Sequence, residues 1–129
     1  METMATNQAN NPATANKNLP VDMERLMDLT GGEVEMLREL VDMYLVQTAT
    51  QLSVIAAAIG NHQADTIRIE AHSCGGASNT MGITRLGQIL LELERQGKSG
   101  IILPNAAELC KEAQSELGRV QEFLAGKLG

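Results

Sequence analysis

Apolar side chains recur every three or four residues along most of this chain, a spacing that places them on one side of an α-helix. Short segments that contain glycine separate one repeat from the next, and glycine at such positions commonly ends a helix. The sequence shows no alternation of apolar and polar residues long enough to predict a strand. The pattern predicts a short helix over residues 21–29 and long helices over residues 33–59, 64–81, 83–96 and from 104 to the C-terminal region.

Helices joined by brief turns usually lie antiparallel to their neighbours along the chain. We therefore predict an all-α fold, an antiparallel up-down-up-down four-helix bundle with a short extra N-terminal helix. Residues 1–19 are rich in Asn, Ala and Thr without an apolar period, so we expect a disordered tail there and one bundle domain over residues 20–127. Residues 97–100, Gly-Lys-Ser-Gly, are interpreted as the turn before the last helix.

The composition indicates a small domain with an aliphatic core. A chain of 129 residues suits one domain, and only 2% of it is aromatic, namely Tyr44 and Phe123. A core with so few aromatic side chains must be built from Leu, Ile, Val, Met and Ala, which favours helices over a sheet. Cys74 and Cys110 lie on apolar stripes without metal-ligand spacing, so we expect two reduced core cysteines, with a disulfide as the minor alternative.

The formal net charge of -6 argues against a nucleic-acid partner and against an anionic membrane surface, since both require a basic face. No uninterrupted apolar run reaches the roughly 18–20 residues of a membrane span. The N-terminal region lacks the basic and then apolar segments of a secretory signal. We therefore expect a cytoplasmic protein. The predicted bundle also leaves no obvious spare apolar face.

Residues 71–82, which read AHSCGGASNTMG, contain the strongest candidate for function. At about 100° per residue, His72 points away from the apolar stripe and stands on the solvent side of its helix. Its neighbours one turn away are Arg68 on one side and Gly75 and Gly76 on the other. Two glycines inside a helix cost about 1 kcal/mol each relative to alanine, and the close approach of another molecule would explain them. The alternative is a histidine without function beside a helix end.

The same segment resembles the centre of histidine-containing phosphotransfer (HPt) domains. That centre has Ala-His, an apolar residue, Lys, Gly, small residues and a later Gly. His72 and Gly82 occupy the corresponding positions here, whereas Gly75 stands where the family usually has lysine. The family's downstream pattern of spaced leucines, which ends in Leu-Glu, is matched up to Glu94, and the resemblance covers roughly residues 20–125.

The resemblance implies that His72 accepts a phosphoryl group and relays it to or from the aspartate of a response-regulator receiver domain. Such a protein is a stoichiometric phosphocarrier rather than a turnover enzyme, and its partners are a receiver domain, a hybrid histidine kinase or both. The resemblance also suggests a monomer. It needs no cofactor of its own, because the partner receiver brings the aspartate and Mg²⁺. Neutral imidazole is a competent nucleophile near pH 7, since its ordinary pKa is about 6.5.

The residues around the histidine are expected to support the transfer. Arg68 lies one turn before His72 and could supply the positive charge that the usual lysine provides, since its guanidinium suits phosphate. Gly75 and Gly76 would let the partner's surface come close to the helix. Asn79 could hydrogen-bond the partner at the rim, or simply be solvated.

Two other readings of the sequence remain open. Gly75 at the lysine position favours an HPt-like adaptor that docks a receiver or kinase without carrying phosphate. The third hypothesis is a helical structural protein with an incidental histidine. His62, the other histidine, is interpreted as a surface residue. Met36 and Met43 are interpreted either as core fillers or as part of a docking surface.

Overall fold

Each apolar repeat forms a helix in the computed structural model, which describes residues 19–128. The predicted all-α class is confirmed, and these described residues contain no strand. The tail predicted over residues 1–19 lies outside the described part of the chain, except for Leu19. The short repeat forms α3 (Met23–Asp28), and the longer ones form α4 (Val34–Gly60), α5 (Ala64–Thr80), α6 (Thr84–Ser99) and α7 (Ala106–Leu128).

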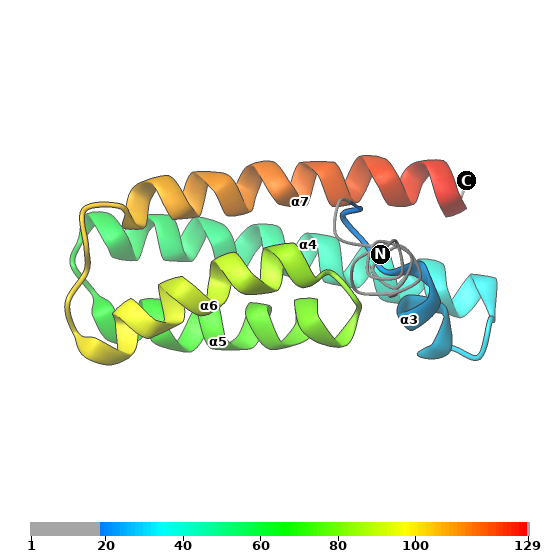
Figure 1. Cartoon of the computed structure of the whole chain (residues 1–129), viewed down its shortest axis with the longest axis horizontal. Helices are drawn as coiled ribbons and strands as arrows, with labels where there is room; N and C mark the ends of the chain where they lie inside the picture. The colour runs from blue at the N-terminus through cyan, green and yellow to red at the C-terminus, as the bar shows by residue number, and fades with distance from the viewer. Residues whose placement is uncertain (1–18, 129) are drawn as a thin grey trace, which may run out of the picture.

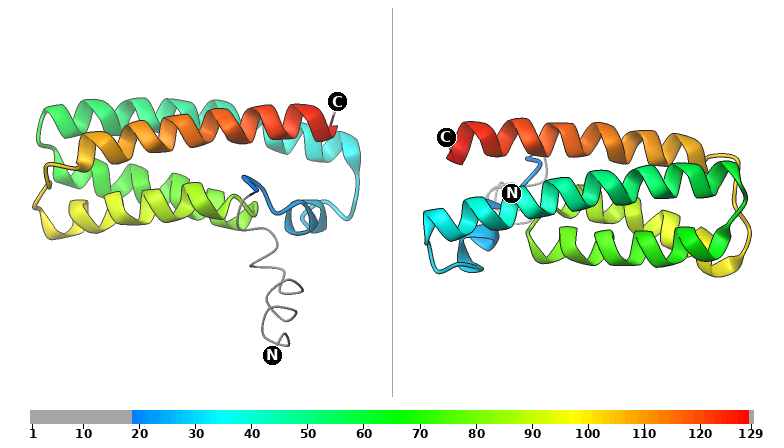
Figure 2. Two further views of the ribbon diagram at one scale, coloured as in Figure 1. Left: turned by 45° about the horizontal axis from the view of Figure 1, so that its top comes forward. Right: turned by 180° about the vertical axis from the view of Figure 1, so that it is seen from behind.

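The four long helices form a bundle in which each contacts the next. α4 packs on α5, α5 on α6 and α6 on α7, and α7 returns to α4 and closes the ring. Figure 1 shows successive long helices running in alternate directions, which agrees with the predicted up-down order. In Figure 2, α3 lies at one end of the bundle. There the Asp22 amide nitrogen donates to the Gly82 carbonyl oxygen in the turn between α5 and α6, at 2.8 Å.

The core is aliphatic, and Tyr44 is the one buried aromatic residue in the described range. Its phenol oxygen lies 2.6 Å from Ser78 Oγ, which in turn donates to the Cys74 carbonyl oxygen at 2.7 Å. Burial raises the pKa of Tyr44 to about 12 and that of the Cys74 thiol to about 12. Cys74 and Cys110 are both buried and free, which confirms the prediction of two unpaired core cysteines.

Gly97 allows α5 and α6 to approach each other at the end of the bundle near the α6–α7 connection. A β-carbon on Gly97 would lie 2.6 Å from the Arg68 amide nitrogen and 2.8 Å from the Ala64 carbonyl oxygen. These are backbone atoms, which cannot move aside as the end of a flexible side chain can. A glycine at this position is therefore explained by helix packing.

The prediction that the turn after α6 begins at residue 97 was wrong. α6 continues to Ser99, and Gly100, with a φ of 77°, ends it in the left-handed conformation that favours glycine. The sequence pattern gave Gly97 the role of helix terminator, whereas its lack of a side chain is needed for the contact with α5. Because α6 is longer than predicted, Lys98 is a helical residue.

α4 is the one helix in residues 19–128 that is long and apolar enough, by length and composition, to cross a membrane. Polar residues such as Gln47 and Gln51 interrupt its apolar sequence, so no continuous apolar run of that length exists. The core helix of a soluble bundle passes the same test. The buried stripe of α4 packs in the bundle, and α4 contacts both α5 and α7, so its hydropathy alone is weak evidence for a membrane span.

Candidate functional site

His72 lies near the middle of α5 and faces solvent, as the helical period predicts. Its side chain is 76% exposed. Ile67, Ala71 and Cys74 on the opposite side of the helix are fully buried. The apolar stripe therefore fixes the rotation of α5 about its axis, and that rotation presents the imidazole to an approaching molecule.

A carboxylate on the neighbouring helix holds the imidazole. His72 Nδ1 lies 2.9 Å from Oε2 of Glu94, on α6. The Glu94 side chain is only 11% exposed, and the same Oε2 lies 3.6 Å from Nζ of Lys98, one turn further along α6. The three side chains thus form a continuous polar chain that runs from the exposed imidazole across to α6.

The contact with Glu94 determines which ring nitrogen can react. An ionised carboxylate only accepts hydrogen bonds, so the neutral imidazole must carry its proton on Nδ1. The lone pair is then on Nε2, the nitrogen away from Glu94. Within residues 19–128, Nδ1 is the ring nitrogen that bonds to protein, which leaves Nε2 available as a nucleophile at a side chain that is mostly exposed.

A small hollow of about 150 Å³ adjoins the histidine between α5 and α6. The three residues predicted to dock a partner, Gly75, Gly76 and Asn79, line it together with His72. Because the glycines have no side chains, the surface beside the imidazole is recessed. The other lining residues come from α6 and are Gly87, Leu91 and Glu94.

The two adjacent glycines have different surroundings. A β-carbon on Gly76 would meet nothing within 4 Å, so this position is open, as predicted. Gly75 is buried, and a β-carbon there would lie 3.3 Å from Cβ of Leu90 on α6. The expectation that both glycines form bare exposed surface was therefore wrong for Gly75. It sits where α5 meets α6, which gives it a packing role.

Asn79 packs across the two helices instead of extending freely into solvent. Its amide lies directly over Gly87 on α6, and a methyl group on Gly87 would overlap it. Asn79 is nevertheless exposed, and it lines the same hollow as His72. Its predicted hydrogen bond to a partner stays a prediction.

Arg68 is not brought into contact with the histidine. Its Nε and a terminal guanidinium nitrogen lie 3.0 Å and 2.8 Å from one carboxylate oxygen of Asp65, one turn earlier on α5. The predicted role of Arg68 in holding a phosphoryl group would require it to leave this ion pair. An exposed pair of this kind is weak, so its supporting role stays a prediction.

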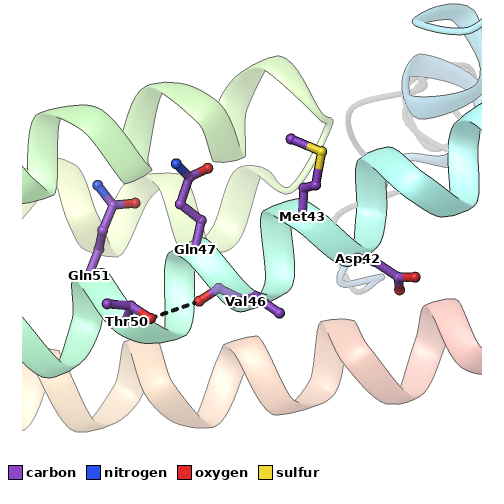
Figure 3. A pocket seen from close by; sticks show the side chains of 6 residues that line it. All are labelled: Asp42, Met43, Val46, Gln47, Thr50 and Gln51. Atoms are coloured by element: carbon purple, nitrogen blue, oxygen red, sulfur yellow. Dashed lines mark hydrogen bonds between the residues drawn. The ribbon is translucent and has the colours of Figure 1, made fainter.

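An exposed apolar groove lies on the outer side of α4 and extends toward the histidine helix. Figure 3 shows Met43, Gln47 and Gln51 projecting from one edge of α4. Gln51 Nε2 donates to Ser73 Oγ at 3.0 Å, and Ser73 directly follows His72 on α5. The groove, of about 700 Å³, therefore borders the surface that carries the histidine. Its lining residues are Asp42, Met43, Val46, Gln47, Thr50 and Gln51.

The exposure of the two methionines separates the alternatives left open by the sequence. Met43 is 65% exposed and lines the groove, and Met36 is 56% exposed but lies outside it. Neither is a core filler. His62 is exposed, as predicted, and adopts a positive φ of 55° in the turn between α4 and α5.

Sequence reasoning missed Glu94 and Lys98 as members of the site. Glu94 was noted only as part of the leucine pattern, and Lys98 was assigned to a turn. The available signal was their spacing, since a glutamate four residues before a lysine forms an ion pair when both are helical. No group of three or more His, Cys, Asp or Glu residues suited to a metal ion occurs in the described part of the chain.

The sequence and the fold together define the class of protein. A family model described as the Hpt domain matches residues 39–123, which is more than half of the chain. The chain therefore belongs to the Hpt domain family, whose members carry phosphoryl groups on histidine in phosphorelays.

One solved structure resembles the chain over most of its length. It is the crystal structure of histidine-containing phosphotransfer protein B (HptB) from Pseudomonas aeruginosa PAO1, with a TM-score of 0.78 and 24% sequence identity. The match covers 86% of this chain and 96% of that chain. At this identity the likeness concerns the fold. No curated protein sequence matches the chain.

Proposed function

We propose that this protein is a phosphocarrier that accepts a phosphoryl group on His72 and passes it to or from the aspartate of a response-regulator receiver domain. The observation that carries this proposal is the imidazole itself. It is 76% exposed, and its Nδ1 is bonded to a nearly buried carboxylate. Membership of the Hpt family supports the class of reaction.

The geometry suits nucleophilic attack by Nε2. Glu94 keeps the proton on Nδ1 and stabilises the positive charge that the ring acquires when Nε2 bonds to phosphorus. Phosphoryl transfer depends mostly on positioning and charge neutralisation, so one well-held nucleophile is sufficient on this side of the complex. The receiver would contribute the aspartate and Mg²⁺. The protein would then act stoichiometrically, without the turnover of an enzyme.

The surface around the histidine supports docking of a protein partner. Leu91 on α6 and Ile69 on α5 are 44% and 50% exposed, and the groove at Met43 and Val46 adds further apolar area on α4. α4 carries no charged residue from position 43 to position 60. Exposed apolar surface that adjoins a reactive side chain is typical of protein interaction sites. We infer that the receiver covers this surface while its aspartate meets Nε2.

The proposal is tested by incubating the protein with a phosphorylated receiver domain and measuring label that is acid-labile and stable in alkali. The wild-type chain should take up label, His72→Gln should take up none, and His62→Gln should behave like the wild type. His72 lies outside the core, so its replacement should leave the unfolding curve unchanged. Binding of the receiver without labelling would instead favour the adaptor hypothesis.

A further inference from the structure

We propose that Lys98 supplies the positive charge that accompanies the phosphoryl group onto His72. This inference rests on the proposed function of His72 as the phosphoryl acceptor. Lys98 Nζ lies 3.6 Å from Glu94 Oε2, and the same oxygen lies 2.9 Å from His72 Nδ1. The lysine thus places a cation in direct contact with the carboxylate that holds the nucleophile.

The position of Glu94 creates the need for such a cation. Its carboxylate favours the positive charge on the imidazole, but it also repels an incoming phosphoryl group, which is itself negatively charged. Because the Glu94 side chain is only 11% exposed, water screens this repulsion poorly. An ammonium group next to the carboxylate offsets it and leaves the hydrogen bond to Nδ1 intact.

Two other nearby cations, Arg68 and Arg95, face carboxylates that do not contact His72, whereas Lys98 contacts the carboxylate that does. Arg68 is held by two contacts to Asp65, and Arg95 on α6 lies 3.4 Å from Glu92. The Lys98 side chain is 64% exposed, and its flexible stem lets Nζ swing from Glu94 toward oxygens bound at Nε2.

The fold explains why this lysine is in place. Lys98 is helical only because α6 continues past Gly97, and Gly97 fits there because it lacks a side chain against the α5 backbone. Residues four apart on a helix lie on the same face, so Glu94 and Lys98 both face the edge of α5 that bears His72. The close contact between α5 and α6 therefore sets the relative positions of His72, Glu94 and Lys98.

The transfer step balances without a further reactant. The Nε2 lone pair forms a bond to phosphorus as the bond between phosphorus and the aspartyl oxygen breaks, and the aspartate leaves as a carboxylate with that electron pair. Nδ1 keeps its proton, so the phosphorylated ring carries a positive charge that faces Glu94. The Lys98 ammonium keeps all its protons and faces the phosphoryl oxygens. The reverse step regenerates neutral imidazole.

The test compares Lys98→Gln and Lys98→Arg with Lys111→Gln, which removes the same charge from an exposed position on α7. Each variant is phosphorylated with phosphoramidate, which requires no docking partner, and separately from a phosphorylated receiver. We expect Lys98→Gln to slow labelling about fivefold with both donors, as befits the loss of one exposed charge interaction. Lys98→Arg should retain most of the rate, and Lys111→Gln should match the wild type.

Salt provides a readout that a merely structural role would not change. The advantage of the wild type over Lys98→Gln should shrink as ionic strength rises, because screening weakens the charge interaction. Equal rates for Lys98→Gln and Lys111→Gln would overturn the role of Lys98 while leaving His72 as the acceptor. A larger loss in Arg68→Gln than in Lys98→Gln would likewise overturn it, in favour of Arg68. If the wild-type chain takes label from neither donor, the proposed function itself is wrong.

Discussion

At the scale of single residues, the function depends on how one exposed imidazole is held. The helical period of α5 is enough to predict that His72 faces solvent, because its rotation follows from the buried residues on the same helix. The contact with Glu94 could not be predicted in this way, since the two residues are 22 positions apart and belong to different helices. Their meeting depends on how α5 and α6 are packed, which a single-helix pattern does not contain.

Replacing Glu94 by alanine should slow the phosphorylation of His72 about tenfold, because a charge-assisted hydrogen bond of about 1.5 kcal/mol would be lost from the nucleophile. Without the carboxylate, the proton is free to occupy either ring nitrogen, and the positive charge on the phosphorylated ring has no counterion. Labelling rates measured with phosphoramidate would show this effect. The matched control is Glu92→Ala, also on α6, where the carboxylate pairs with Arg95. A wild-type rate in Glu94→Ala would contradict the assigned role.

At the scale of helices, the pair α5 and α6 forms the site, and glycines decide how closely the two helices pack. Sequence patterns predicted both helices but not the role of each glycine, because the same residue can end a helix, expose its backbone or permit close packing. Gly100 ends a helix, Gly76 is open to solvent, and Gly97 is pressed against the α5 backbone. Only the three-dimensional packing separates these cases.

Replacing Gly97 by alanine should lower the free energy of unfolding by about 2 kcal/mol, since the added methyl group would force the α5 and α6 backbones apart. Gly76→Ala is the matched control. Nothing lies within 4 Å of a β-carbon there, so the higher helix propensity of alanine should raise stability by about 1 kcal/mol. Urea denaturation of both variants measures the two effects. Stabilisation by Gly97→Ala would refute the packing explanation.

The outer face of α4 gives a prediction about docking. Met43→Glu places a charge in the exposed apolar groove and should reduce the affinity for a receiver domain about tenfold, a typical loss at an apolar interface position. Met36→Glu adds the same charge on α4 outside the groove and should bind normally. Titration calorimetry with the receiver would distinguish the two variants. Equal affinities would show that the groove lies outside the interface.

At the scale of the whole molecule, the sequence predicted the fold class and, for residues 19–128, the number and order of the helices. The apolar repeats determined the helices, and the short connections determined their alternate directions. The ring of contacts from α4 to α7 and back follows from burying one apolar stripe on each helix. The exposed groove on α4 did not follow, because the sequence does not show which apolar residues the neighbouring helices leave uncovered.

The buried core also predicts how stability depends on alkaline pH. Burial raises the pKa of Tyr44 from 10.0 to about 12 and that of Cys74 from 9.0 to about 12, so the folded state resists deprotonation of both groups. Their contribution to stability is fully present below the unfolded-state pKa values and is lost as pH rises through about 12. As pH rises from the unfolded-state pKa values to about 12, the urea midpoint of the wild type should fall steeply. The fall should be shallower in Tyr44→Phe combined with Cys74→Ala, and identical slopes would contradict this assignment.

Locating the phosphoryl group on the phosphorylated protein is the sharpest test of the chemistry proposed for His72. Nitrogen-15 and phosphorus-31 NMR can identify the phosphorylated residue and distinguish the two ring nitrogens of a phosphohistidine. Because Glu94 Oε2 holds Nδ1 at 2.9 Å, we predict that the phosphoryl group is bonded to Nε2 of His72 and that Nδ1 retains its proton. A phosphoryl group on Nδ1, or on any residue other than His72, would contradict the role assigned to Nε2 of His72.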